Sequence, residues 1–193
     1  MSVPFHQIRA EYSDTTVTVY QAYSPEIARA AVAAGRFVEP FRRGRMTWIK
    51  PSFLWMMYRC GWAEKPGQER VLRIEITRAG FAWALAHSCH SHFVAGRYTD
   101  HADWSRRLAE SPVRIQWDPE RDPALAPLPY RSLQVGLAGA AVDRYVDEWI
   151  VSINDITPAV RAIRSRQPGA RVPIERPYPL SPELADAIGA DAY

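Results

Sequence analysis

The chain has 193 residues, a length that suits one domain and can bury a sizeable core without disulfides or a metal. Its net charge of +3 and hydrophobic fraction of 47% exclude a disordered or highly charged chain. It has no apolar run long enough for a membrane span, no apolar core of a secretion signal, and too few cysteines for a disulfide scaffold. We therefore expect a cytoplasmic protein with no membrane partner, and the sequence leaves its oligomeric state open.

The first half of the chain alternates strands and helices. Strands are indicated by β-branched or alternating apolar residues, and helices by serine or threonine caps, an early proline or a closing glycine. The predicted elements are a strand at 17–20, a helix from Pro25 to about Gly35, a strand at 45–50, a helix at 53–60 that Ser52 caps, a strand at 71–76, and a helix after Thr77.

The second half is richer in polar loops and prolines, which separate its elements. The predicted order is a polar loop at 88–101, a helix that Asp100 caps and that reaches 110, a strand at 113–117, a loop at 118–129, a strand at 133–137, a helix at 140–147, a strand at 149–153, a helix from 157 to about 166, an extended stretch at 167–180, and a short helix that starts at Ser181 and closes at Gly189.

Strands and helices are interspersed at irregular spacing, which argues against a regular βαβ repeat. We therefore predict an α+β fold: a single compact domain over residues 1–193 with a split, mostly antiparallel sheet flanked by helices. The proline-rich C-terminal extension, 167–193, is expected to pack on this domain.

Several long runs are distinctive enough to suggest a family. They include RMTWIKPSFLWMMYRCGW at 45–62, QERVLRIEITRAGFAWAL at 68–85 and EWIVSINDIT at 148–157. With shorter runs between them, they resemble the family catalogued as domain of unknown function 4291, over about residues 5–190. The resemblance implies a shared fold and, by itself, no function.

A more remote resemblance links the segment VYQAYSPEIARAAVAAGRF, at 19–37, to ADP-ribosyltransferases. It is similar to their first strand and helix, in which a Tyr-His-Gly-Thr-like run precedes Ser-Pro-Glu, a small amphipathic helix and Gly-x-Phe. Gln21 stands where that class often has histidine, and Ala22 stands where it has glycine.

Two further segments continue this resemblance in the same order along the chain. The run Lys-Pro-Ser at 50–52, followed by Tyr58, is similar to the region that cradles nicotinamide in ADP-ribosyltransferases. The run Glu-Trp-Ile-Val at 148–151 is similar to the late strand that carries their catalytic glutamate. The resemblance implies an ADP-ribosyltransferase-like fold with NAD as its substrate.

The resulting enzyme hypothesis is transfer of ADP-ribose from NAD to a nucleic-acid or protein acceptor. Glu148 would be the catalytic residue, because a carboxylate near the ribose can stabilise an oxocarbenium-like transition state. Tyr58 also has a simple structural explanation, packing on its own helix, and Ser52 has one as a helix cap. The residues expected to hold NAD are Arg9, Gln21, Tyr23, Arg45, Lys50, Ser52 and Tyr58.

The rival hypothesis is a non-catalytic module that binds RNA or DNA. Seven tryptophans and nine tyrosines could stack on bases, and the basic residues within 42–50 and 161–176 could contact phosphates. This hypothesis predicts exposure of Trp48, Trp55 or Trp62 beside a continuous basic face. The enzyme hypothesis predicts instead that four residues meet in one cleft: Gln21, Ser52, Tyr58 and Glu148.

Two polar clusters contain residue types that bind cations but lack the usual spacing. The run HSCHSH at 87–92 has no paired Cys-x-x-Cys or His-x-x-x-His ligands for zinc. The acidic residues of 118–122 alternate in a predicted loop without the glycine turn of a calcium loop. We therefore expect NAD as the only small-molecule partner and no metal.

Overall fold

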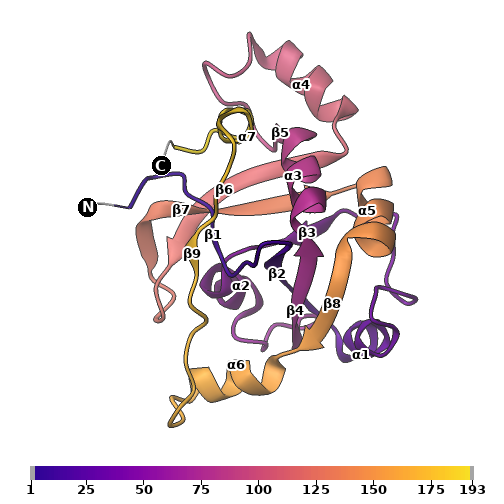
Figure 1. The fold of residues 1–193 in the computed structure, drawn as a ribbon, viewed down its shortest axis with the longest axis vertical. Coiled ribbons are helices and arrows are strands. Elements are labelled where there is room, and N and C mark those ends of the chain that lie inside the picture. Colours follow the sequence, from indigo (N-terminus) through magenta and orange to yellow (C-terminus); the bar gives the residue numbers. More distant parts are fainter. Residues whose placement is uncertain (1–2, 192–193) are drawn as a thin grey trace.

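Strand β4 (Arg70–Thr77) is the centre of a three-stranded antiparallel sheet with the order β2-β4-β8. Strand β2 (Thr16–Tyr23) pairs with β4 along its whole length, and β8 (Ile150–Asp155) pairs with the other edge of β4. The computed structural model describes residues 3–191 (Figure 1). Leu72, Ile74 and Ile76 are fully buried, as their alternation predicts.

The second sheet has four strands in the order β3-β7-β6-β5. Its central pair, β6 (Val113–Arg121) and β7 (Pro127–Leu137), forms a long antiparallel hairpin. Strand β3 (Thr47–Ile49) adds to one edge, and β5 (Ser88–His90) runs parallel to the other edge. The inward face of β6 carries apolar side chains and its outward face polar ones.

An isolated β-bridge joins the two sheets at a corner. The N–H of Tyr20 donates to the carbonyl of Lys50 over 2.7 Å, and the N–H of Lys50 donates back to Tyr20 over 3.3 Å. Tyr20 belongs to β2, whereas Lys50 directly follows β3. The corner therefore places the end of β3, from one sheet, beside the middle of β2, from the other.

Helices cover the faces and ends of the sheets (Figure 1). Gly35 and Gly61 end two of them in the left-handed conformation that favours glycine. Each helix of the described chain is too short or too polar to span a bilayer. The helices are α1 (Pro25–Ala34), α2 (Phe53–Cys60), α3 (Arg78–Ala86), α4 (His101–Glu110), α5 (Ala140–Arg144) with its π-helical continuation η1 (Tyr145–Trp149), α6 (Thr157–Arg164) and α7 (Pro182–Ile188).

Two hydrophobic clusters make up the core. The larger one lies between the sheets and helices α1, α3 and α7, and the smaller one lies under α2 and α6. Burial of this apolar surface is the main favourable term in folding. The smaller cluster, which supports the start of α2, contains Tyr20, Phe53, Met56, Met57, Cys60, Ala63, Val71 and Val160.

The C-terminal segment runs from α6 along one side of the molecule to α7 and passes the N-terminal segment (Figure 1). Strand β9 (Arg176–Pro177) pairs with β1 (Arg9–Ala10). Next to this pair, Tyr178 is buried against Phe81 of α3, with ring centroids 5.4 Å apart. The extension is thus part of the packed structure.

These elements confirm the predicted α+β class and the predominance of antiparallel pairing. Two predicted loops were wrong in part. Residues 88–90 form β5, and the predicted loop at 118–129 is a hairpin in which only 122–126 lie outside β6 and β7. The ends of β6 and β7 were missed because they contain proline and acidic residues, which are rare inside strands.

Trp149 was predicted to start a strand but lies in the π-helical turn η1. A methyl group added to Gly80 of α3 would lie 2.3 Å from Cγ of Trp149, so the indole packs directly on the helix backbone at a glycine. This close contact holds residues 145–149 against α3. The last strand of the sheet therefore begins one residue later, at Ile150.

Candidate functional site

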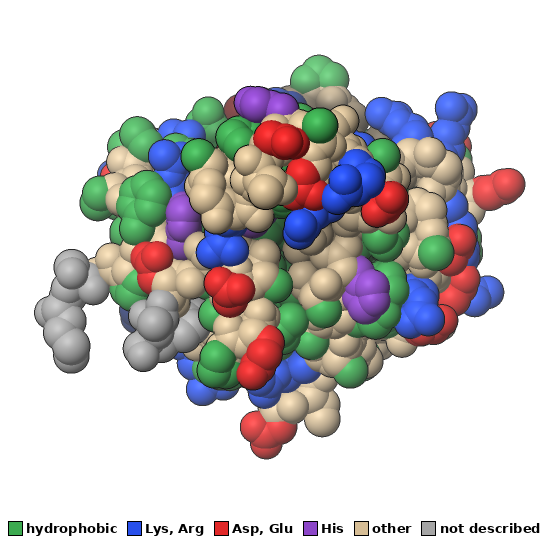
Figure 2. Space-filling model, turned by 90° about the horizontal axis from the view of Figure 1, so that it is seen from above, with side chains coloured by type: hydrophobic (Ala, Val, Ile, Leu, Met, Phe, Trp, Pro, Cys, Tyr) green, Lys and Arg blue, Asp and Glu red, His purple; other side chains and the backbone are tan. Residues whose placement is uncertain are grey.

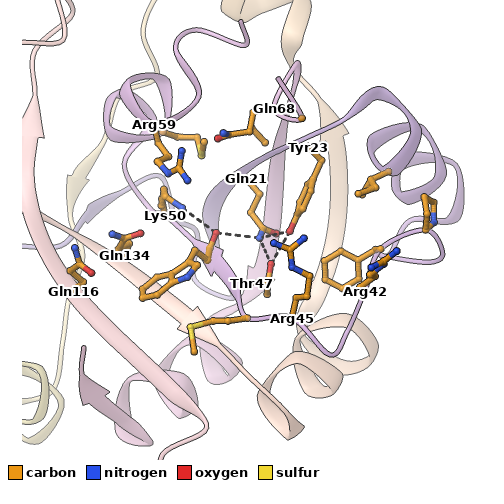
Figure 3. A pocket seen from close by; sticks show the side chains of 18 residues that line it. Gln21, Tyr23, Arg42, Arg45, Thr47, Lys50, Arg59, Gln68, Gln116 and Gln134 are labelled. Carbon is orange, nitrogen blue, oxygen red and sulfur yellow. Dashed lines mark hydrogen bonds between the residues drawn. The ribbon is translucent and has the colours of Figure 1, made fainter. Parts of the chain in front are cut away.

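A cavity of about 590 Å³ opens at the corner between the two sheets. Its walls come from the end of β2, from β3, from one side of α2, and from the loop residues 40–46 and 67–68 (Figure 3). The outward faces of β6 and β7 add the amide side chains of Gln116 and Gln134. We call this cavity the corner pocket.

Four basic side chains line the corner pocket: Arg42, Arg45, Lys50 and Arg59. Among the described residues, none that lines the pocket is acidic. Figure 3 shows Arg59 and Lys50 on one side of the opening and Arg42 and Arg45 on the other. A hollow with cations on two sides and no lining carboxylate attracts anions.

Lys50 is the most unusual of these residues because its side chain is buried. It is 5% exposed, and within residues 3–191 its ammonium donates one hydrogen bond, to the carbonyl of Trp48 over 3.3 Å. Burial, together with nearby Arg59 and against the pull of Asp118, lowers the pKa of Lys50 to about 7. An ammonium has three donors, so an anion in the pocket could satisfy the other two.

The floor of the corner pocket is a closed hydrogen-bond network around Gln21. The hydroxyl of Tyr145 donates to Oε1 of Gln21 over 2.7 Å, and Nε2 of Gln21 donates to Oγ1 of Thr47 over 2.7 Å. The hydroxyls of Tyr23 and Thr47 are 2.8 Å apart. Burial raises the pKa of Tyr23 to about 12, against the effect of these hydrogen bonds. The Gln21 amide is thus satisfied internally and holds Tyr23 and Thr47 in place.

Two other residues predicted to hold NAD lie outside the corner pocket. Ser52 is 1% exposed, donates to Glu120 over 2.9 Å, and accepts a hydrogen bond from the N–H of Trp55 over 3.1 Å as the cap of α2. Tyr58 is 38% exposed and stacks on Trp55, with ring centroids 5.1 Å apart and Arg121 above its ring. Ser52 is thus the helix cap that its sequence position also suggested, whereas Tyr58 lies at the surface and is not part of the core.

Arg9 and Glu148 also lie away from the corner pocket. The guanidinium of Arg9 donates to Gln7 over 3.0 Å and to the carbonyl of Glu175 over 3.2 Å. The carboxylate of Glu148 projects from η1 with 59% of its side chain exposed, 3.9 Å from Arg144. The predicted meeting of Gln21, Ser52, Tyr58 and Glu148 in one cleft does not occur, whereas Gln21, Tyr23, Arg45 and Lys50 do share the pocket.

A second group of ionisable side chains lies on the other side of the start of α2. Glu120 accepts hydrogen bonds from Ser52 and from the N–H of Arg121, and Glu175 accepts one from the N–H of Phe53 over 2.6 Å. Burial raises the pKa of Glu120, and burial raises that of Glu175 to about 8. We call Glu120, Glu175 and their partners the acid cluster. The proline and acidic residues of 118–129 predicted a loop there and gave no sign that Glu120 is buried.

Sequence reasoning missed part of the pocket lining. Gln116 and Gln134 occupy outward positions that alternate with buried apolar residues, a pattern that normally indicates solvent. Arg59 lies on an exposed helix position. Only the bend between the sheets turns these positions toward one cavity, and periodicity carries no signal for such a bend.

The tryptophans do not form the open platform that a nucleic-acid module requires. Trp55 is buried, and Trp48 and Trp62 are half-buried. Figure 2 shows one end of the molecule, where basic and acidic side chains are interspersed. The geometry therefore gives this hypothesis no specific support.

The histidine-rich segment is explained by packing contacts. The ring of His87 stacks on Trp83 at 4.0 Å, and Nδ1 of His90 lies 2.9 Å from the hydroxyl of Tyr98. Burial lowers the pKa of His90 to about 4. Across residues 3–191, no three His, Cys, Asp or Glu side chains are grouped to hold a metal ion.

The fold and the corner pocket define an α+β protein with a cavity lined by basic side chains between two sheets. Residues 7–178 match the sequence profile of a family described as "Domain of unknown function (DUF4291)", and the chain belongs to this family. Among curated proteins, none matches the sequence.

Proposed function

We propose that the corner pocket binds NAD through its pyrophosphate, as part of an ADP-ribosyltransferase-like activity. The observation that carries this proposal is the buried ammonium of Lys50, which has one hydrogen-bond acceptor, in a pocket without a lining carboxylate. A buried charge whose hydrogen bonds are incomplete costs free energy, and a bound anion reduces that cost. The pyrophosphate of a dinucleotide supplies both charge and acceptor oxygens.

The other features of the pocket suit the rest of a dinucleotide. Its volume, about 590 Å³, is within the range of pockets that hold small-molecule ligands. Arg42, Arg45 and Arg59 offer the forked donors that match phosphate oxygens. The hydroxyls of Tyr23 and Thr47, fixed by Gln21, are available at the floor for a ribose.

The geometry supports NAD binding more strongly than it supports transfer of ADP-ribose. The pocket lining has no carboxylate to stabilise a cationic ribose, and Glu148 lies on η1, exposed and beside Arg144. Transfer to a nucleic-acid or protein acceptor would require Glu148, or a group from the acceptor, to reach the bound ribose. Binding and nicotinamide release therefore need separate measurements.

Calorimetric titration with NAD tests the binding proposal. We expect saturable binding by the wild type, and binding at least about 10-fold weaker in Lys50→Met and Arg45→Ala, because each loses a charge-assisted hydrogen bond. Arg29→Ala is the matched control, since Arg29 is an exposed arginine of α1 outside the lining. An absence of binding at millimolar NAD, or equal weakening in the control, would refute the proposal.

The transfer step is tested by nicotinamide release from bound NAD. If Glu148 is catalytic, Glu148→Gln keeps the wild-type affinity for NAD and loses nicotinamide release. If Glu148→Gln releases nicotinamide at the wild-type rate, Glu148 has no catalytic role.

A further inference from the structure

One end of the corner pocket differs in chemistry from the rest because it is made of an indole and two amides. Trp48 of β3, Gln116 of β6 and Gln134 of β7 line this end. In Figure 3, Gln116 and Gln134 lie at the opposite end of the pocket from Arg42. Flat aromatic and amide groups, unlike guanidinium groups, suit an uncharged planar ring.

The indole of Trp48 is held over the sheet by a glycine. Trp48 is opposite Gly136 in the register of β3 and β7. A methyl group at position 136 would lie 2.9 Å from Cζ2 and 3.0 Å from Cε2 of the indole, closer than van der Waals contact allows. The absence of a side chain at Gly136 therefore lets the indole lie down on the strand, so that it forms part of the pocket wall.

The two amides are fixed by one carboxylate behind them. Nε2 of Gln116 donates to Asp118 over 2.8 Å, and Nε2 of Gln134 donates to the other oxygen of Asp118 over 2.6 Å. A carboxylate only accepts, so the amide nitrogens of both side chains must face Asp118. Each glutamine keeps one N–H and its carbonyl oxygen for other contacts, and the oxygen of Gln116 also accepts from Ser91 over 3.2 Å.

We infer that Trp48, Gln116 and Gln134 form a subsite for the adenine ring of the nucleotide, an inference that rests on the proposed NAD binding. The indole of Trp48 stacks on the ring, and a glutamine amide pairs with its donor and acceptor edge, as glutamine does with adenine in nucleic-acid recognition. Adenine is favoured over nicotinamide because the nicotinamide ring of NAD is cationic and Lys50 lies beside this subsite. The phosphates then extend toward Lys50 and the arginines.

Three probes separate the subsite from the rest of the pocket: adenosine monophosphate, nicotinamide mononucleotide and inorganic pyrophosphate. For Trp48→Ala we expect at least about 10-fold weaker binding of adenosine monophosphate, with the affinity for pyrophosphate unchanged. Trp48→Phe should restore most of the loss, because a phenyl ring still stacks. Gln134→Met should weaken adenosine monophosphate about 5-fold and leave pyrophosphate unchanged.

Unchanged pyrophosphate affinity also shows that each variant is folded. The subsite is refuted if Trp48→Ala and Gln134→Met bind adenosine monophosphate as tightly as the wild type does. It is also refuted if they weaken nicotinamide mononucleotide instead. Wild-type binding of pyrophosphate without either mononucleotide would refute the subsite while leaving an anion pocket. No binding of any probe or of NAD would refute both proposals.

Discussion

Lys50 and Ser52 are two residues apart, yet their side chains serve opposite regions of the molecule. Lys50 faces the corner pocket, and Ser52 faces the acid cluster. Both regions bury ionisable groups beside the start of α2. The acid cluster supplies partners from within the chain, since Glu120 has Ser52 and a backbone N–H, and Glu175 has the N–H of Phe53. The ammonium of Lys50, by contrast, donates to one acceptor, the carbonyl of Trp48.

This difference indicates which buried charge is structural and which is kept for a ligand. A buried group whose hydrogen-bond partners come from the fold is structural, whereas a charge beside a cavity with few partners costs stability until something binds. The acid cluster should therefore matter for unfolding and little for ligand affinity. Removing the Lys50 charge from the corner pocket should instead raise stability and weaken ligand binding.

The largest expected effect is a gain in stability from Lys50→Met. Lys50 has its pKa lowered from 10.5 to about 7, so its charged form is disfavoured by folding. The cost is fully present below pH 7 and disappears as the pH rises to 10.5, where both states are neutral. Lys50→Met should raise the free energy of unfolding by about 3 kcal/mol at pH 6. Urea unfolding at pH 6, 8 and 10 measures this gain and its decline.

Arg29→Met, at an exposed position of α1, is the control for this series and should change stability by less than about 0.5 kcal/mol. A loss of stability in Lys50→Met at pH 6 would show that Lys50 is well partnered in the free protein. That result would remove the main argument for an anion ligand.

The second effect has the opposite sign and lies in the acid cluster. Ser52→Ala removes the cap of α2 and a hydrogen bond to buried Glu120, so we expect a loss of about 2–3 kcal/mol. Ser181→Ala is the matched control, because Ser181 caps α7 in the same way but its carboxylate partner, Glu183, is exposed, and the variant should lose about 1 kcal/mol. Chemical unfolding measures both. If folded Ser52→Ala bound NAD more weakly than the wild type, Ser52 would have to be assigned to the NAD site.

The third effect is a pH dependence carried by Glu175. Its pKa is raised from 4.5 to about 8, so its contribution to stability is complete below pH 4.5 and is lost as the pH rises through 8. Glu175→Gln should remove this slope and be about 2 kcal/mol more stable than the wild type at pH 8. The exposed Glu110→Gln serves as control. Parallel pH profiles of unfolding for wild type and Glu175→Gln would contradict the prediction.

The smallest effect links ligand binding to protons. At pH 8 most Lys50 side chains in the free protein are neutral, and a bound phosphate should restore the charge, so binding takes up about one proton. Affinity for NAD should fall about 10-fold from pH 6 to pH 8 for the same reason. Calorimetry in buffers of different ionisation enthalpy measures the uptake. Its persistence in Lys50→Met would assign the proton to another group.

Much of the fold could be predicted from the sequence, because the patterns that indicate its helices and strands are local. The cap at Ser52, the proline at the start of α1 and the glycine at position 35 mark helix ends at the observed positions. The alternation in β4 marks its buried face. These signals depend on residues a few positions apart, which sequence periodicity records.

Only part of the candidate site could be predicted from the sequence, because the bend between the two sheets brings its residues together. Lys50 and Arg45 stand out as basic residues near a strand end, and Gln21 and Tyr23 follow from the resemblance to a known first strand. The role predicted for Glu148 depended on a strand at 148–151. The structure places Glu148 on the π-helical turn η1 instead, next to the contact of Trp149 with Gly80. A contact between residues so far apart leaves no pattern in either segment.

The pairing of β1 with β9 has a consequence for how the chain is made. Arg9 and Ala10 meet Pro177 and Arg176, and His6 exchanges hydrogen bonds with Asp191. During synthesis residues 6–10 leave the ribosome long before their partners, residues 176–191. The first strand must therefore wait, unpaired and open to chaperones or proteases, until nearly all of residues 3–191 have been translated.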